Sequence, residues 1–461
     1  MSECRDYKID LKEFKKAFNF TEKGLTHKQG SNCKLLPYVT DDEKVVNDFS
    51  GVIGEFSRLI SDKEVESIFN CEEFIDQVIK QIDEYKGDLS KQIFRDIIKN
   101  MFVEGDKLIN FDIKTLNYIY STKEEKKIAY FIYSILFDEN IKEEISSHYN
   151  RDMNNILYKL VLKALPKLRE KKYLAGDYKC YLSYVKELFI KDFSFLIKNE
   201  ELYKNSLKRL LEYYYMFYIS QLIIKLDKFE KVDLSKVEKI YYTLSWESIS
   251  KNRTAYRLGW ELLKSKVNSL FSHAITLELL NTNGNKNQLG YVELAEVYNS
   301  MNKDEIEENL KEAVDAYQNQ IKDIVWDEFE ITSKQSEVNG FNEVYRLYDL
   351  IEYQFNNSSR KRAYDGYKNW FKKFVEKSFA KTRGQLGYTL NMTEDDIILM
   401  TKICINNKKK LKLNVLFQEF EKRGLFFDMD SSKKIIQLYE KLNLLEKKSD
   451  SGDAKYVRSV L

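Results

Sequence analysis

Three residues near position 110 come closest to a metal-dependent nuclease site in this sequence. Asp106, Asp112 and Lys114 stand in the stretch EGDKLINFDIK, and two-metal nucleases hold their ions with converging carboxylates. Because 32% of all residues are charged, a D-x-K pattern arises easily by chance. We therefore expect these residues to lie on a solvated strand edge. A cryptic metal-dependent nuclease remains the less favoured alternative.

Other catalytic motifs are missing from the sequence. The closest match to a phosphate-binding GxxxxGK[ST] loop is NGNK at 283–286, which lacks the second glycine and the Ser or Thr that binds magnesium. The three histidines, His27, His148 and His273, are too scattered for a zinc motif of two ligands at fixed helical spacing. We expect His273 to be a partly buried, hydrogen-bonded helix residue. The sequence thus predicts no enzyme, no metal site and no cofactor.

The region 358–385 concentrates positive charge among aromatic residues. It holds nine basic and two acidic residues, a local charge of +7. Its aromatic residues recur at spacings of three and four, which predicts a helix with an aromatic core face and a basic face that could neutralise phosphates. A solvated helix face is the alternative. The candidate DNA-binding residues in this region are Arg360, Lys361, Arg362, Lys368, Lys372 and Lys373.

The last 70 residues have the order of a winged-helix domain. Thr393 and Asp396 form a capping box that starts a helix through residue 406, and further helices are expected at 414–423 and 431–442. Two extended pieces follow, at 444–448 and 455–460. Such modules also serve as protein-protein adaptors. The candidate DNA-binding residues on the third helix and the hairpin are Lys433, Lys434, Gln437, Lys441, Lys447 and Lys455.

The elements that must position these residues are mostly helical. With only 2 Pro and 16 Gly in 461 residues, the strongest helix breakers are rare. We predict a mostly α fold: a multi-helix bundle with a small mixed α/β N-terminal part and a C-terminal winged-helix-like module. The expected segments are 1–115, 116–390 and 391–461.

Five local segments support this division. Residues 206–226 are apolar on both sides, which is typical of a helix inside a bundle. Residues 45–60 carry an apolar stripe at helical spacing, and 263–277 carry a second helical seam. Short extended pieces are expected in the N-terminal part, at 34–39 and 107–113.

Composition also bounds the location of the protein. The formal charge is only +2, from 75 basic and 73 acidic residues, so any nucleic-acid surface has to be local. The charged N-terminus has no apolar signal region, and the longest apolar stretch, 213–226, is too short to span a bilayer. The five cysteines contain no CxxC pair, which indicates a reducing compartment. We expect a cytoplasmic protein without a membrane partner.

Several longer strings carry a family resemblance. They are GVIGEFSRLI at 51–60, NILYKLVLKALP at 155–166, YTLSWESISKNRTAYRLGW at 242–260, LFSHAITLELLN at 270–281 and SDSGDAKYV at 449–457. From about residue 30 onward, the chain resembles the bacterial DNA phosphorothioation-dependent restriction protein DptG family.

The resemblance implies a subunit of an anti-phage defence complex. Its modification partners replace a non-bridging phosphate oxygen of host DNA by sulfur, and its restriction partners damage DNA that lacks this mark. DptF-like and DptH-like subunits would be the companions and would carry the ATP-handling motifs. The family supplies no catalytic residue to carry over.

Sequence and resemblance together predict a non-catalytic restriction subunit. It would help to assemble the complex and contact the backbone of double-stranded DNA, which positions a protein without reading sequence. The competing hypothesis is a pure adaptor that uses both basic segments to bind an acidic protein.

Overall fold

The computed structural model describes residues 7–82, 84–85, 88–152, 155–173, 176–284, 287–331, 334–447 and 455–460. This part of the chain holds nineteen α-helices and ten short strands. Helices make up 59% of the protein, which confirms the prediction of a mostly α fold. None of the helices described combines the length and apolar character needed to cross a membrane.

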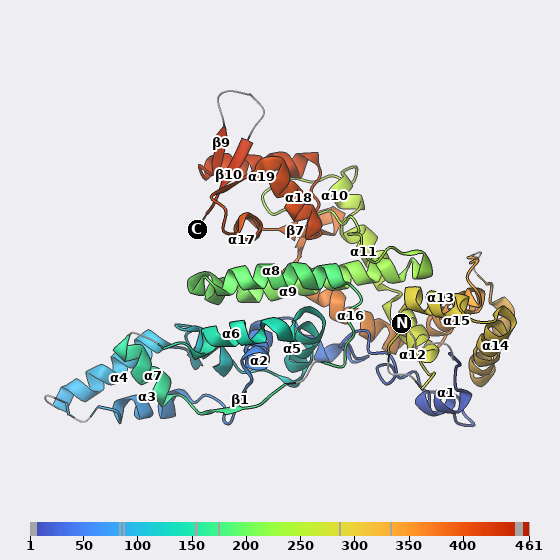
Figure 1. The fold of residues 1–461 in the computed structure, drawn as a ribbon, viewed down its shortest axis with the longest axis horizontal. Coiled ribbons are helices and arrows are strands. Elements are labelled where there is room, and N and C mark those ends of the chain that lie inside the picture. The colour runs from blue at the N-terminus through green and yellow to red at the C-terminus, as the bar shows by residue number, and fades with distance from the viewer. Residues whose placement is uncertain are drawn as a thin grey trace.

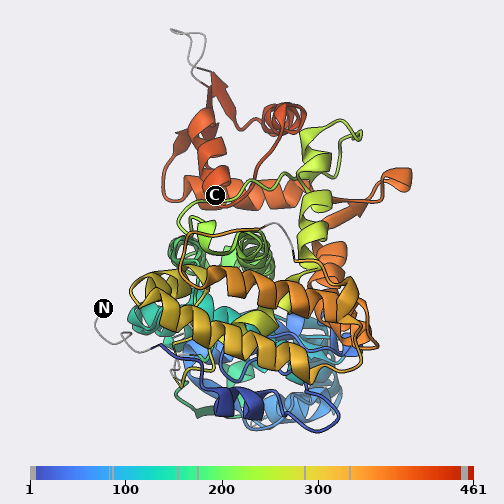
Figure 2. The same cartoon turned by 90° about the vertical axis from the view of Figure 1, so that its right-hand side faces the viewer.

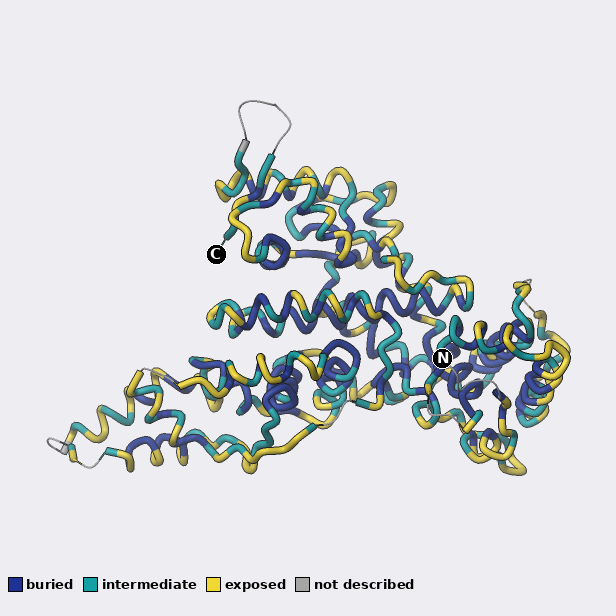
Figure 3. The backbone as a smooth tube through the Cα atoms, viewed as in Figure 1, coloured by how far each residue is buried: buried dark blue, intermediate teal, exposed yellow. Residues whose placement is uncertain are grey.

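Two long antiparallel helices form the middle layer of the molecule. They are α8 (Ser183–Ile197) and α9 (Glu200–Leu226). Figures 1 and 2 show them between the N-terminal helices and the C-terminal elements. Every residue from Leu210 to Leu226 is buried. Figure 3 shows buried stretches along the pair, with exposed and intermediate residues between them. The expectation that this apolar helix lies inside a bundle is therefore confirmed.

The N-terminal helices pack under this layer. Helix α2 begins at Ser50, five residues later than predicted, and packs against α5 and α6. Gly54 permits a close approach, because a Cβ atom there would lie 2.3 Å from the carbonyl oxygen of Ile119. The helices in this part are α2 (Ser50–Ser61), α5 (Lys123–Leu136) and α6 (Lys142–Asn150), with the 3-10 turns η1 (Asp42–Lys44), η2 (Ile113–Tyr118) and η3 (Glu139–Ile141). The first helix, α1 (Leu11–Ala17), lies instead at the far end of the molecule, where the N–H of Ile9 donates to Asn309 Oδ1 (Figure 1).

The extended piece expected at 34–39 forms no strand. This segment runs as a loop, and nearby backbone N–H groups are satisfied by side chains instead of a neighbouring strand. Lys34 N donates to Gln288 Oε1 at 2.9 Å, and the N–H groups just before it donate to Glu278. Of the piece expected at 107–113, only Lys107–Leu108 is a strand.

Three helices form a separate lobe with its own small hydrophobic cluster. Phe74, Ile98 and Val161 lie in this cluster, one from each helix. The lobe projects from the body at one end of the molecule (Figure 1). Its elements are α3 (Cys71–Ile79), α4 (Asp88–Phe102), α7 (Ile156–Ala164) and the hairpin β2 (Val103–Glu104) and β3 (Lys107–Leu108). The antiparallel pair β1 (Lys63–Val65) and β4 (Leu168–Glu170) lies outside this cluster, and β1 contacts α2 and η2 of the body.

Further helices follow α9 in the chain, and most of them pack near its C-terminal end. The seam predicted as one helix over 263–277 is two helices, because the chain turns at Asn268 and Ser269. These helices are α10 (Thr254–Arg257), α11 (Trp260–Val267), α12 (Leu270–Leu280), α13 (Tyr291–Asn299), α14 (Lys303–Gln320), α15 (Phe341–Asn356) and α16 (Lys361–Ser378), with the 3-10 turns η4 (Phe229–Lys231) and η5 (Trp326–Glu328).

The C-terminal elements follow a mixed three-stranded sheet. Strand β7 lies in its centre, parallel to β5 and antiparallel to β6. Its strands are β5 (Thr243–Leu244), β6 (Ala380–Thr382) and β7 (Tyr388–Met392), with η6 (Gly384–Leu386) in the β6–β7 turn.

The three C-terminal helices lie within two residues of their predicted bounds. Both hydrogen bonds of the Thr393–Asp396 capping box are present. A short strand after the first helix joins the hairpin, giving an antiparallel sheet of order β8-β10-β9 that was not predicted. The elements are α17 (Glu394–Ile405), β8 (Lys410–Lys412), α18 (Leu413–Lys422), α19 (Met429–Lys441), β9 (Leu445–Lys447) and β10 (Lys455–Arg458).

The main hydrophobic core is shared along the chain. It contains buried residues from Tyr7 to Val457. The division into 1–115, 116–390 and 391–461 stays a prediction.

Candidate nucleic-acid interface

A buried ion pair attaches the C-terminal elements to the middle layer. Arg423, after α18, binds Asp192 of α8 through two hydrogen bonds of 2.7 Å, and neither side chain is exposed. Tyr214 of α9 donates a third hydrogen bond to this carboxylate at 2.5 Å. Because an unpaired buried charge is very unfavourable, these contacts fix the position of α18 on α8.

Two more arginine–carboxylate clusters join the C-terminal helices to earlier parts of the chain. Arg209 of α9 binds Asp396 of α17 through both carboxylate oxygens, at 2.6 and 2.9 Å. Arg253 binds Asp428, the N-cap of α19, and also Glu247 at 3.0 Å. The arginine in each cluster is at least 175 residues away in sequence from its partner across the junction. Local spacing therefore gave no signal for these three clusters.

Helix α19 exposes the polar face that the sequence predicts. Lys433, Lys434, Gln437 and Lys441 are all exposed. On the opposite face, Ile435, Leu438 and Tyr439 are buried. Within the described residues, none of the three lysines has a carboxylate partner within 4 Å.

The first turn of α19 is held by the body of the protein. Asp428 accepts the N–H of Ser431 at 3.0 Å while it binds Arg253. The hydroxyl of Ser431 donates to Glu247 at 2.8 Å. The three lysines thus lie beyond the anchored first turn.

The hairpin candidates are only partly described. Lys455 is half-buried on β10 and lies opposite Lys447 of β9 in the antiparallel register. The side chain of Lys447 and residues 448–454 lie outside the described residues.

Helix α16 buries its aromatic face as predicted, but several of its cations are engaged within the protein. Arg360 pairs with Asp323 at 2.9 and 3.0 Å and donates to Gln354. Lys368 pairs with Asp365 at 2.6 Å. The buried aromatic residues are Tyr364, Tyr367, Trp370, Phe371 and Phe374.

An acidic turn of the N-terminal part lies against α16. Lys373 Nζ lies 3.5 Å from Asp42, and Trp370 Nε1 donates to the carbonyl of Asp41 at 3.3 Å. Hydrogen bonds with Lys44 and with the backbone of Glu43 lower the pKa of Asp41, and the nearby charge of Arg362 lowers it further.

The basic face of α16 is therefore less free than the local charge of +7 indicates. Of the six candidates, Lys361, Arg362 and Lys372 make no ion pair with a described residue. Lys361 and Arg362 are exposed, and Lys372 is half-buried.

The acidic residues near position 110 do not share one environment. Asp112 is fully buried and caps η2 by accepting the N–H of Lys114 at 2.8 Å, so the expected solvated edge is wrong for it. Asp106 is exposed in the β2–β3 turn, and Lys114 Nζ donates to the carbonyl of Arg151 at 2.6 Å. Across the described residues, no group of three or more His, Cys, Asp or Glu side chains is placed to hold a metal ion.

Two histidines lie among aromatic rings, one half-buried and one buried. His27 Nε2 lies 2.7 Å from the hydroxyl of Tyr317, and His273 Nδ1 lies 2.9 Å from the hydroxyl of Tyr291. His273 is fully buried, not partly buried as expected, and its Nε2 has no hydrogen-bond partner among the described residues. Burial lowers the pKa of both histidines to about 3, with smaller contributions from nearby cations.

These histidines should make stability fall in mild acid. Both stay neutral in the folded protein, whereas in the unfolded chain they gain a proton below their ordinary pKa of 6.5. Their contribution is complete above pH 6.5 and is lost as pH falls toward 3, by up to about 1.4 kcal/mol per pH unit for each histidine. We expect urea unfolding to show a smaller loss between pH 7 and 5 in the double variant His27→Gln and His273→Asn. An equal loss in both proteins would contradict this assignment.

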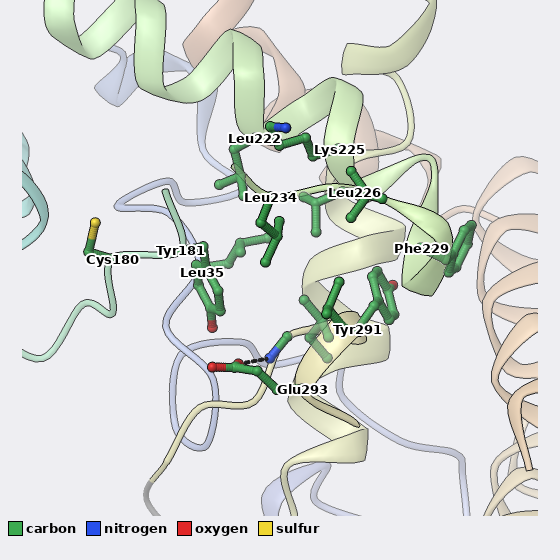
Figure 4. Close-up of a pocket in the computed structure, with 14 residues that line it drawn as sticks. Leu35, Cys180, Tyr181, Leu222, Lys225, Leu226, Phe229, Leu234, Tyr291 and Glu293 are labelled. Carbon is green, nitrogen blue, oxygen red and sulfur yellow. Dashed lines mark hydrogen bonds between the residues drawn. The ribbon is translucent and has the colours of Figure 1, made fainter. Parts of the chain in front are cut away.

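An apolar cavity of about 90 Å³ lies between the end of α9 and the start of α13 (Figure 4). The polar groups at its wall already have partners. Lys225 Nζ donates to the carbonyls of Asp233 and Lys236 at 2.7 and 2.6 Å. Glu293 accepts the N–H of Gly290 at 2.8 Å. The cavity thus presents mainly apolar walls, with residues such as Leu35, Leu222, Leu234, Leu277 and Val292.

No protein-family model matches this chain, and a comparison with proteins of curated function finds no relative.

Proposed function

We propose that this protein is a non-catalytic subunit of a phosphorothioation-dependent DNA restriction complex. The resemblance of its longer strings to the DptG family supports this role. In this proposal, the protein helps to assemble the complex with DptF-like and DptH-like subunits. It also contacts the backbone of double-stranded DNA.

The proposed DNA-binding element is a C-terminal winged helix. The order of helix, strand, two helices and hairpin, with a β8-β10-β9 sheet, supports this assignment. The observation that carries the proposal is the exposed face of α19, where Lys433, Lys434 and Lys441 have no described carboxylate partner. In helix-turn-helix proteins, such a helix enters the major groove.

The contact is proposed to be with phosphates and not with base edges. Recognition helices read bases mainly with their N-terminal residues. Here the first turn of α19 is tied to Arg253 through Asp428, and it also carries Asp430. Carboxylates at this position disfavour close contact with DNA, while the lysines farther along the helix suit phosphate oxygens.

Duplex binding across a salt series tests this proposal. We expect the variant K433E/K434E/K441E to bind a 20-base-pair duplex at least about tenfold more weakly than wild type. The slope of log affinity against log salt should become less steep by about 0.9 for each phosphate that the variant no longer neutralises. The matched control, K12E/K15E/K311E, changes the charge by the same amount at exposed lysines of α1 and α14 and should bind more tightly than the α19 variant. Fluorescence anisotropy of a labelled duplex measures the affinity and the salt slope of each protein.

Failure of the wild-type protein to bind duplex DNA would refute direct contact, as would equally weakened binding in the two variants. A protein-protein adaptor would then be the favoured function. One observation already favours that alternative: α4 exposes an apolar stripe at four-residue spacing, which suits a partner helix. The stripe consists of Leu89, Ile93, Ile97 and Met101.

A further inference from the structure

The exposed face of the β8-β10-β9 sheet has a composition different from that of α19. Strand alternation places Leu411 and Val457 on the inner face, where both are buried. The outer face carries Lys410, Lys412, Tyr456, Arg458 and Glu446, and in register Tyr456 lies opposite both Lys412 and Glu446. Helix α18 contacts β8 and β10 and α19 contacts β9, so these helices cover the inner face. The outer face is therefore a second surface, separate from the lysines of α19.

The outer face and the turn beside it together carry more net positive charge than the exposed face of α19. The turn before β8 adds exposed Lys408 and Lys409, so the turn and outer face together hold five cations and one acid, a net charge of +4. The exposed face of α19 has three lysines with Asp430 and Glu440, a net charge of +1. Glu446 pairs with Lys410 at 2.8 Å and with Arg458 at 3.5 Å. The other cations, Lys408, Lys409 and Lys412, have no ion pair with a described residue.

A tyrosine stands in the middle of these cations. Tyr456 is partly exposed on the central strand, with Lys410 Nζ 5.1 Å from its ring centroid. An aromatic ring among cations on a sheet is the arrangement by which proteins hold single strands, since bases stack on the ring while phosphates meet the cations. A duplex keeps its base faces stacked on one another, so it cannot use such a ring without opening.

We propose that the outer face of this sheet binds a single-stranded polynucleotide. One base stacks on the ring of Tyr456, in the place now taken by the ammonium group of Lys410. The displaced ammonium group is then close enough to bind a phosphate of the same strand. Lys408, Lys409 and Lys412 bind neighbouring phosphates. This activity goes beyond the proposed contact of α19 with duplex DNA and uses different residues.

Binding of the full-length protein to labelled oligo(dT) and oligo(rU) 20-mers tests the proposal by fluorescence anisotropy. We expect Tyr456→Ala to weaken binding at least about fivefold, because stacking on one aromatic ring contributes that much or more. Tyr456→Phe keeps the ring and should bind like wild type. Tyr456→Leu keeps a branched apolar side chain without the ring and should behave like the alanine variant. The strand bound more tightly identifies DNA or RNA as the ligand.

Heparin separates stacking from simple charge attraction, because it is a polyanion without bases. Tyr456→Ala should leave heparin binding unchanged, while K408E/K409E/K412E should weaken binding of both heparin and oligonucleotide. The α19 variant K433E/K434E/K441E should retain oligo(dT) binding, so this proposal and the duplex proposal can fail independently. The proposal is overturned if wild type does not bind either 20-mer, or if Tyr456→Leu, folded by circular dichroism, binds them as tightly as Tyr456→Phe.

Discussion

Replacing Arg423 by alanine is expected to lower the free energy of unfolding by about 3–5 kcal/mol. The guanidinium and the Asp192 carboxylate are both fully buried and joined by two hydrogen bonds of 2.7 Å. Removal of the arginine leaves Asp192 as a buried charge with only the hydroxyl of Tyr214 described as its side-chain donor. Restoring water to that carboxylate requires opening the contact between α18 and α8. Urea unfolding followed by tryptophan fluorescence measures the destabilisation.

Arg362→Ala is the matched control, because Arg362 is exposed on α16 and forms no ion pair with a described residue. Its effect should stay within about 0.5 kcal/mol. The double variant Arg423→Met and Asp192→Leu removes both charges, and we expect it to be more stable than Arg423→Ala alone. If Arg423→Ala unfolds at the same urea concentration as wild type, the pair does not hold the C-terminal elements in place.

Replacing Glu278 by alanine is expected to cost about 4 kcal/mol, because it removes the acceptor of several backbone donors at once. The Glu278 carboxylate is buried on α12 and accepts the N–H groups of Gly30, Ser31, Asn32 and Cys33 at 2.9–3.2 Å. The bond from Cys33 is buried and the other three are partly buried. A buried donor left without a partner costs about 1–3 kcal/mol, and a partly buried one costs less. The loop should then separate from α12, so limited proteolysis near residue 30 should speed up along with the decrease in stability.

Glu278→Gln keeps one carbonyl acceptor and should be destabilised less than the alanine variant. Glu308→Ala serves as the control, because Glu308 is exposed on α14. Its removal leaves no described backbone donor without an acceptor. Equal stability of Glu278→Ala and Glu308→Ala would show that water replaces the carboxylate without cost.

Much of the candidate interface could be predicted because its signals are local. The capping box at Thr393 and the apolar spacing of Ile435 and Leu438 fix the start of α17 and the buried side of α19. Once that side is known, the exposure of Lys433 and Lys434 follows from helix geometry. Strand β8 was missed because three residues carry too little pattern to distinguish a strand from a loop.

Helix α16 shows that counting charged residues in a segment does not reveal which of them form ion pairs. The aromatic spacing placed its buried face correctly, and nine basic residues in 358–385 indicated a free basic face. Whether each cation is free depends on which carboxylates the chain brings near it. Arg360 forms an ion pair with Asp323, and Lys373 forms one with Asp42. Asp42 is 331 residues away from Lys373 in sequence.

The sequence by itself determined the mostly helical fold, the interior position of α9 and the two faces of α16 and α19. These properties depend on spacings of three or four residues and on the scarcity of proline and glycine, so they are set within a few turns of chain. Only the tertiary structure decided that Asp192 meets Arg423, that Asp112 is buried as a helix cap, and that cations gather around Tyr456. Such pairings depend on the path of the whole chain, and local periodicity carries no information about that path.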